Sequence, residues 1–298
     1  MDLSGIFPAL TTPFSEDGSV SLSGLKQNIL RYNAIGLAGY VVLGSTGESV
    51  LLSGTEADGI LETVKENAAK GKLLIAGTGA ESTAETIERT KRAAELCYEV
   101  ALVKTPYYYK PAYKPDVLIA HFRRVADASP IPVLLYSVPQ FTGVTLETPE
   151  IVALAEHPNV IGIKDSSGHV QRISEVMGLV RPSFQILTGG APVVLPSLSV
   201  GARGAILALA SALPEKCVAL YQFFRQGEWE KAREVQIALA RASRTMVSES
   251  GIAGVKFVMD QRGYHGGVPR LPLQPLSERS KQGILEMLAT LEPATARA

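Results

Sequence analysis

Lys164 is the residue in this sequence whose surroundings best suit covalent chemistry. It ends the apolar run 160–163 and is followed by the polar run 165–168. An ammonium at the mouth of a buried strand loses part of its water, which disfavours the charged form and lowers its pKa toward that of a nucleophilic amine. Such a lysine can form a Schiff base with a carbonyl compound. On this segment alone, the alternative is a lysine whose stem follows the strand while its charge reaches solvent.

Hydroxyl groups stand at the ends of two other apolar runs. Tyr136 ends one of them, and a phenol beside an imine-forming amine can relay protons, although a lone tyrosine more often packs in a wall. Ser45 and Thr46 lie between Gly44 and Gly47. Glycines let the backbone approach a ligand, and hydroxyls with free amides can bind a carboxylate. An ordinary glycine turn explains the same motif equally well.

A second strand-end lysine, Lys104, competes with Lys164 for the covalent role. Side chains alternate across a strand, so Gly162 shares a face with Lys164 and leaves room beside it, whereas Leu102 shares a face with Lys104. This favours Lys164. The histidines are scattered without the paired spacing of a metal site; they are His121, His157, His169 and His265. We expect neither metal nor separate cofactor, although carboxylates distant in sequence could still assemble a metal site.

Composition points to a small-molecule partner. The chain has 298 residues, of which 46% are hydrophobic, and 29 basic residues balance 29 acidic ones. No global charge therefore favours nucleic acid or an anionic membrane. Cys97 and Cys217 lie in apolar, helix-like stretches, which suits reduced core thiols. We see no signal peptide, and the most apolar stretch, residues 193–214, is interrupted by proline, glycine and arginine, so we expect a cytoplasmic protein without a membrane span.

Eight short β-rich runs, most of them followed by a helix-like segment, must position these residues. The predicted strands are residues 6–12, 40–44, 73–77, 100–105, 132–137, 160–164, 184–188 and 204–209. Alternating strands and helices predict a parallel sheet. At this length we predict an α/β fold, a (β/α)8 TIM barrel over residues 1–212, with an open doubly wound sheet as the alternative.

Residues 213–298 are predicted to form a C-terminal helical extension packed on the barrel, with helices within residues 214–248 and 281–291. In a parallel barrel the C-terminal strand ends open on one face, where chemistry is found. Ser45, Thr46, Tyr136 and Lys164 all fall at such ends. The barrel therefore predicts that these four residues share a site.

Four ordered motifs resemble the dihydrodipicolinate synthase/N-acetylneuraminate lyase family of class I aldolases. They are Gly44-Ser45-Thr46-Gly47-Glu48, Thr105-Pro106-Tyr107-Tyr108, Tyr136-Ser137-Val138-Pro139 with Gly143, and Gly162-Ile163-Lys164-Asp165. The resemblance covers almost the whole chain. It implies a TIM barrel whose lysine forms a Schiff base with pyruvate or a related 2-oxo acid.

The resemblance also implies a role for each matched residue. Lys164 is the imine former and Tyr136 the proton relay. Tyr108 matches a tyrosine that a neighbouring subunit inserts, which implies a homodimer or homotetramer. The pyruvate site would be formed by Ser45, Thr46 and Gly47 at the carboxylate and by Ile206 beside the bound molecule.

Departures from the family motifs bear on the aldehyde that the enzyme uses. Synthases usually carry an arginine shortly after the proline of the fifth strand, where this chain has Gln140 and Phe141. Sialic-acid lyases have acidic residues after the seventh strand, where residues 189–192 are glycine, glycine, alanine and proline. Apolar groups cannot satisfy the hydroxyls of a sugar. These departures disfavour both assignments.

Residues 136–139, 164–168 and 259–273 most resemble 4-hydroxy-2-oxoglutarate aldolases, which implies reversible cleavage to pyruvate and glyoxylate. Ser166, beside Lys164, would assist at the second carboxylate. The alternatives are dihydrodipicolinate synthase, which condenses pyruvate with aspartate semialdehyde to 4-hydroxy-tetrahydrodipicolinate, and a 2-keto-3-deoxy sugar-acid aldolase. From a different class, a non-catalytic 2-oxo-acid sensor would keep the same pocket.

Overall fold

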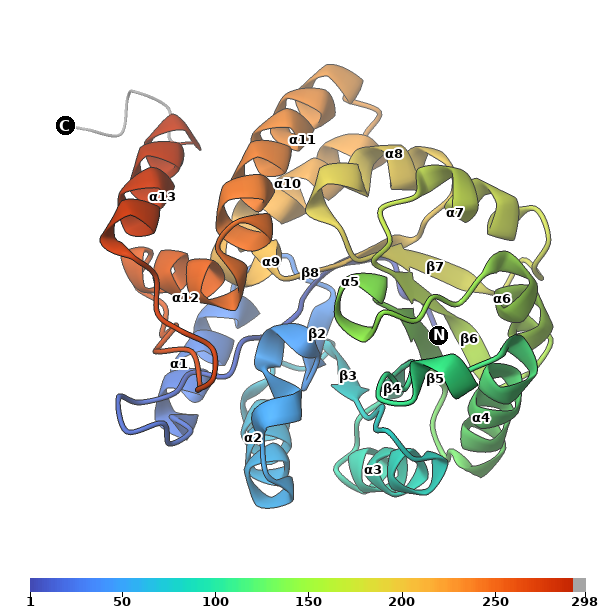
Figure 1. The fold of residues 1–298 in the computed structure, drawn as a ribbon. Coiled ribbons are helices and arrows are strands. Elements are labelled where there is room, and N and C mark those ends of the chain that lie inside the picture. Colours follow the sequence, from blue (N-terminus) through green and yellow to red (C-terminus); the bar gives the residue numbers. More distant parts are fainter. Residues whose placement is uncertain (292–298) are drawn as a thin grey trace.

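Eight parallel strands surround a common axis in the computed structural model, which describes residues 1–291 (Figure 1). The strands are β1 (Gly5–Pro8), β2 (Gly39–Val42), β3 (Leu73–Gly77), β4 (Val100–Lys104), β5 (Val133–Ser137), β6 (Val160–Asp165), β7 (Gln185–Thr188) and β8 (Gly204–Leu207). Each pairs with the next along the chain from β2 to β8, and β8 pairs with β1. A bridge between Ala9 and Val41 joins β1 to β2. The predicted TIM barrel is confirmed.

Helices cover the outside of this barrel (Figure 1). They are α1 (Leu22–Asn33), α2 (Gly54–Asn67), α3 (Thr83–Glu95), α4 (Pro115–Ala128), α6 (Thr148–Ala155), α7 (Val170–Met177) and α8 (Val194–Ser199), with a short α5 (Pro139–Thr142) above β5. Ser53 and Glu56 form a capping box at the start of α2, and Ser82 caps α3 by accepting a hydrogen bond from the Glu85 amide. Such caps satisfy amides that the first helical turn leaves without partners.

Further helices follow the eighth strand and lie together beside α1 and α8 (Figure 1). They are α9 (Leu209–Ala212), α10 (Pro214–Arg225), α11 (Trp229–Ser243), the π-helical segment Arg244–Ser248, α12 (Gly251–Gln261) and α13 (Glu278–Leu291). Sequence reasoning predicted helices at α10, α11 and α13 but not α12. α12 crosses the π-helical segment so closely that a side chain at Gly254 would overlap the Met246 carbonyl.

The barrel interior is filled in layers, and the upper layer carries polar side chains. Below it, apolar residues such as Leu102, Leu134 and Ile206 are fully buried. In the strand register, Lys104 of β4 pairs with Tyr136 of β5, and Tyr136 pairs with Lys164 of β6. Since residues paired in a parallel sheet point to the same face, the three side chains share one layer at the C-terminal end.

Two expectations about local environments were wrong. Cys217 is a buried thiol, but Cys97 is exposed and stands just after α3 in a left-handed conformation with φ 58°. Gly162 does not leave room beside Lys164. Instead, a side chain there would overlap the backbone of Gln185 on β7, so glycine permits the close contact of the two strands.

Candidate active site

Lys164 is buried inside the mouth of the barrel. Its residue is 4% exposed, and its Nζ lies 4.1 Å from the centroid of the Tyr136 ring. Tyr136 itself is buried, at 5% exposure. Within residues 1–291 the Lys164 ammonium has no carboxylate at ion-pair distance. The amine and the phenol predicted to work together are therefore neighbours, and the amine is uncommitted.

The acidic neighbour of Lys164 is paired elsewhere. The Arg172 guanidinium on α7 donates to Asp165 Oδ2 from Nη2 at 2.7 Å and from Nε at 3.0 Å. Asp165 Oδ1 accepts a hydrogen bond from the Ser167 amide at 2.7 Å. Both partners of this ion pair are buried. Asp165 therefore orders the loop after β6 and does not neutralise the lysine beside it.

The turn after β2 presents the predicted carboxylate-binding group. Residues Ser45–Gly47 form a single 3-10 turn, in which Thr46 is buried and Ser45 is half-buried. The Gly47 carbonyl accepts a hydrogen bond from Thr12 Oγ1 at 2.7 Å. A side chain at Gly47 would come within 3.1 Å of the Leu10 carbonyl oxygen, so the turn packs tightly on the chain after β1.

A buried ion pair that sequence reasoning missed stabilises the end of this turn. Glu48 adopts a left-handed conformation with φ 54°, and its Oε1 lies 2.6 Å from Lys256 Nζ of α12, with both side chains 1% exposed. Lys256 also donates to the Val268 carbonyl at 2.7 Å, and Glu48 Oε2 accepts from the Arg270 amide at 2.8 Å. Burial lowers the pKa of Lys256, and the Glu48 carboxylate opposes that shift. The C-terminal helices therefore fix the conformation of the turn.

A pocket of about 560 Å³ opens above the barrel. Ser45 and Lys104 line it from the strand ends, Tyr107 from the loop after β4, and Phe141 from the short helix α5. Ile252 on α12 lines it from the C-terminal helices. A small cavity lined by Ser45, Lys104 and Tyr136 lies beneath it. Ser45 and Lys104 thus connect the outer pocket to the layer that holds Tyr136 and Lys164.

The remaining predicted site residues differ in position. Ile206 is fully buried in the barrel interior. Ser166 is half-buried after β6, with its hydroxyl against Gly189, where a side chain would overlap it. Tyr108 is 72% exposed and packs edge-on against Tyr109 at 5.0 Å. In a single chain, Tyr108 therefore faces away from the buried layer.

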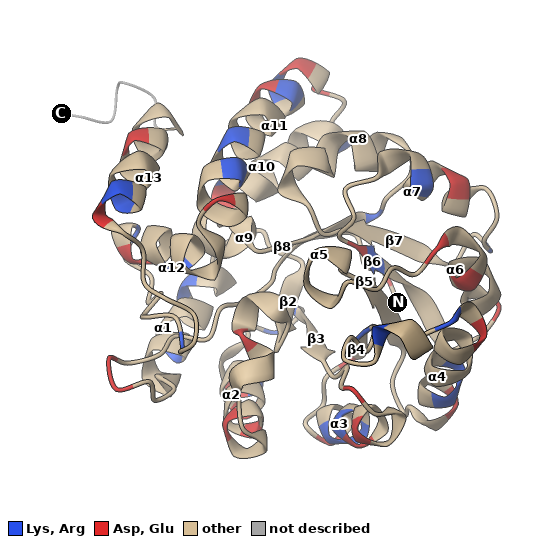
Figure 2. Cartoon of the chain, viewed as in Figure 1, with Lys and Arg blue, Asp and Glu red and all other residues tan. Residues whose placement is uncertain are grey.

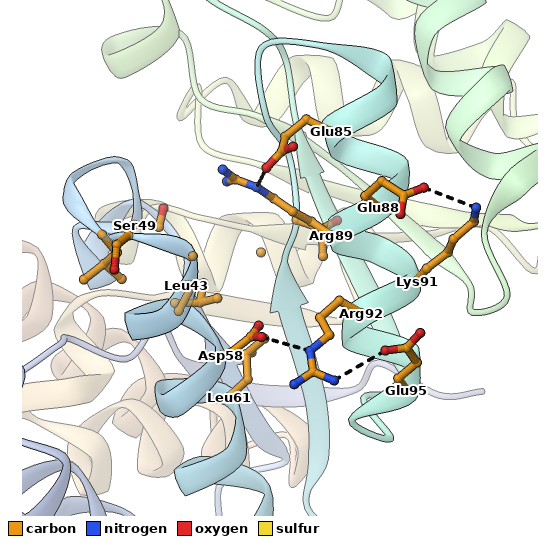
Figure 3. A pocket seen from close by; sticks show the side chains of 16 residues that line it. Leu43, Ser49, Asp58, Leu61, Glu85, Glu88, Arg89, Lys91, Arg92 and Glu95 are labelled. Carbon is orange, nitrogen blue, oxygen red and sulfur yellow. Dashed lines mark hydrogen bonds and ion pairs between the residues drawn. The ribbon is translucent and has the colours of Figure 1, made fainter.

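Charged residues elsewhere gather on the surrounding helices (Figure 2). A second pocket, of about 440 Å³, lies between α2 and α3. In it Arg92 forms ion pairs with Asp58 and Glu95, and Arg89 with Glu85 (Figure 3). Because none of the predicted site residues lines this pocket and its charges are mutually paired, it is not the candidate active site.

Over residues 1–291, no three histidine, cysteine or acidic side chains come together in a group that could hold a metal ion. Among the described helices, none combines the length and apolar character needed to cross a bilayer.

Comparisons with known proteins agree on one family. The model of the dihydrodipicolinate synthetase family matches residues 2–291. The 4-hydroxy-tetrahydrodipicolinate synthase of Exiguobacterium sp. is 37% identical over 284 residues, 95% of this chain and 96% of the relative. That of Methanothrix thermoacetophila is 35% identical over 98% of both chains.

Solved structures agree with these sequence matches. A dihydrodipicolinate synthase from Bacillus anthracis has a TM-score of 0.94 at 28% identity, covering 98% of this chain and 100% of that one. The chloride-inhibited dihydrodipicolinate synthase from Acinetobacter baumannii, solved in complex with pyruvate, has a TM-score of 0.92 at 31% identity, with 96% of this chain and 98% of that one covered.

Proposed function

We propose that this chain, which belongs to the dihydrodipicolinate synthetase family, is a class I lyase that forms a Schiff base between Lys164 and pyruvate. The observation that carries the proposal is the buried Lys164 amine, 4.1 Å from the Tyr136 ring centroid. The absence of a carboxylate partner within residues 1–291 leaves that amine available for a carbonyl carbon.

Pyruvate would bind between the turn after β2 and the barrel interior. The hydroxyls of Ser45 and Thr46 and the backbone at Gly47 bind its carboxylate, while Ile206 lies beside its methyl group. Lys164 attacks the 2-oxo carbon to give a carbinolamine, and loss of water gives the iminium. The hydroxyls and amides of this half-buried turn can bind the carboxylate of pyruvate. No second cation is then needed beside the positively charged iminium.

In the cleavage direction, Lys164 forms the same iminium with the 2-oxo carbon of a 4-hydroxy-2-oxo acid, and this iminium accepts the electrons of the breaking carbon–carbon bond. Tyr136 takes the proton of the 4-hydroxyl group, the bond between C3 and C4 breaks, and an aldehyde leaves an enamine on Lys164. Protonation of the enamine at C3 and hydrolysis release pyruvate and free the lysine. Condensation follows the same steps in reverse. The exposed Tyr108 would complete the proton relay in a neighbouring copy, so we propose a homo-oligomer.

For the aldehyde, the first candidate is aspartate semialdehyde, the partner in the dihydrodipicolinate synthase reaction after which the relatives are named. The second candidate is glyoxylate, with 4-hydroxy-2-oxoglutarate as the cleaved substrate. Phe141 favours it, because this exposed residue lines the outer pocket where synthases usually have an arginine. Both aldehydes carry a carboxylate. Ser166 is our proposed contact for the second carboxylate of 4-hydroxy-2-oxoglutarate.

Borohydride trapping tests the covalent step. Borohydride added with pyruvate should leave the mass of a reduced pyruvyl adduct on the peptide that contains Lys164. Lys164→Met should lose the adduct, whereas Lys104→Met should keep it and serves as the matched strand-end control. An unmodified Lys164 peptide in the wild-type protein would refute the proposal. Steady-state rates with aspartate semialdehyde and with glyoxylate then decide between the two aldehydes.

A further inference from the structure

The outer pocket contains one cation that has no function in the mechanism above. Within the described part of the chain, the charged side chains that line this pocket are those of Lys104 and Glu48. Glu48 is neutralised by Lys256 at 2.6 Å. Lys104 has no carboxylate at ion-pair distance, and its Nζ lies 4.8 Å from the centroid of the Tyr107 ring. Burial lowers the pKa of Lys104, and the charge of Glu81, whose carboxylate accepts a hydrogen bond from the Tyr107 amide at 3.1 Å, opposes that shift. Lys104 therefore presents to the pocket an ammonium that no carboxylate contacts directly.

The backbone is shaped to hold Lys104 in this place. Gly79, which follows β3, lies against it. A side chain at Gly79 would come within 2.6 Å of the Lys104 amide nitrogen and 2.9 Å of its Cγ. The missing side chain allows the lysine stem to lie over the end of β3. From there Lys104 lines both the inner cavity beside Tyr136 and the outer pocket.

A half-buried ammonium without an anion in direct contact is stabilised by a ligand that supplies one. A carboxylate is the natural ligand, because a charge-assisted hydrogen bond is about twice as strong as a neutral one. The carboxylate of pyruvate is assigned to the turn at Ser45 and Thr46. Among the described residues that line this pocket, no other cation is available to the carboxylate of the second substrate, because Gln140 and Phe141 follow Pro139 where synthases usually carry an arginine.

We propose that Lys104 binds the carboxylate of the aldehyde that reacts with the pyruvate enamine, and so selects carboxylated aldehydes over neutral ones. The inference rests on the proposed function and extends it to substrate selection. Its alternative is structural: through its contact with the Tyr107 ring, Lys104 would only order the loop after β4. If Lys104 binds the carboxylate, removal of its ammonium should slow only the reaction of carboxylated aldehydes. If its role is structural, neutral aldehydes should be affected equally.

A matched pair of aldehydes separates these roles. Glyoxylate carries a carboxylate beside its aldehyde group, and glycolaldehyde has a neutral hydroxymethyl group in the same place. Aspartate semialdehyde serves as a longer carboxylated aldehyde. The variants are Lys104→Met, Lys104→Arg and, as control, Lys110→Met, which removes an exposed lysine that does not line the pocket. For each, kcat and KM are measured with every aldehyde, together with borohydride trapping by pyruvate alone.

Lys104→Met should lower kcat/KM for the carboxylated aldehyde about 10-fold to 100-fold, mainly through KM, as expected for the loss of one hydrogen bond to a charged group. With glycolaldehyde the change should stay below about twofold. Lys104→Arg should retain most of the selectivity, and Lys110→Met all of it. Pyruvate trapping should be unchanged in every variant. If Lys104→Met does not fold by circular dichroism, Lys104→Gln carries the same comparison.

Equal losses with glyoxylate and glycolaldehyde would overturn the proposal in favour of the structural role. Unchanged selectivity in Lys104→Met would also overturn it, as would a wild-type protein that forms the pyruvate adduct but uses no carboxylated aldehyde. Failure of the proposed function gives a different result, because the wild-type protein would then form no adduct on Lys164 at all.

Discussion

The buried pair of Glu48 and Lys256 offers a direct test of how the C-terminal helices support the site. Lys256→Met keeps the length of the side chain but removes its charge. It would leave the Glu48 carboxylate buried with the Arg270 amide, at 2.8 Å, as a remaining hydrogen-bond donor. It would also deprive the Val268 carbonyl of the hydrogen bond that it accepts from Lys256 at 2.7 Å.

The expected loss of stability follows from the burial of both side chains. Removal of one partner from a buried ion pair costs about 3–5 kcal/mol, because the other charge stays buried without compensation. For a chain of this size, each kcal/mol lowers Tm by about 2 °C, so Tm should fall by about 6–10 °C. Urea unfolding, followed by circular dichroism, should give the same loss in the free energy of unfolding.

Two further variants make this test specific. Lys281→Met breaks an exposed ion pair with Glu278, whose side chain is 88% exposed, and should change the free energy of unfolding by less than about 1 kcal/mol. Adding Glu48→Gln to Lys256→Met removes the uncompensated charge, so the double variant should be more stable than the sum of the single effects implies. A Lys256→Met protein within about 1 kcal/mol of wild type would refute the reasoning.

Three other predictions concern the chemistry and the pH dependence. Tyr136→Phe should lower kcat by about 10²-fold or more while leaving pyruvate trapping intact; a smaller effect on kcat would remove Tyr136 from the proton relay. Tyr108→Phe should lower kcat in the assembled oligomer. A wild-type protein that sediments as single copies in analytical ultracentrifugation and is fully active under the same conditions would contradict a role across subunits. The hydrogen bond from Arg270 lowers the pKa of Glu56 from 4.5 to about 2, so its stabilising effect is complete above pH 4.5 and is lost as the pH falls toward 2. In urea unfolding across that range, Glu56→Gln should show a shallower loss of stability than wild type; equal slopes would refute this.

Sequence reasoning predicted the barrel and the proximity of Tyr136 to Lys164, because consecutive strands of a parallel barrel are neighbours and their C-terminal ends meet on one face. It favoured Lys164 over Lys104 for the covalent role with a partly wrong argument. The space beside Gly162 is taken by the backbone of β7. Strand alternation correctly put Lys104 on the same face as Leu102, which lies in the barrel interior, but which atoms fill that face depends on strand packing.

Contacts between distant parts of the chain could not be predicted in the same way. Lys256 lies in a segment where two glycines weaken the signal for a helix. Its partner Glu48 lies far from it in the sequence, after the second strand. Nothing in the local pattern indicates that a lysine is 1% exposed. The prediction for Cys97 was wrong for a related reason: this residue lies just past the end of α3, in a left-handed turn whose conformation the local sequence pattern does not indicate.

The single bridge between Ala9 and Val41 has a consequence for motion near the site. The other neighbouring strands are joined by ladders of at least two residue pairs, so we expect local opening of the sheet to require the least energy between β1 and β2. The turn that begins at Gly44 follows β2 directly. Amide protons at the end of β2 should therefore exchange with deuterated solvent sooner than those of β5, and bound pyruvate should slow that exchange.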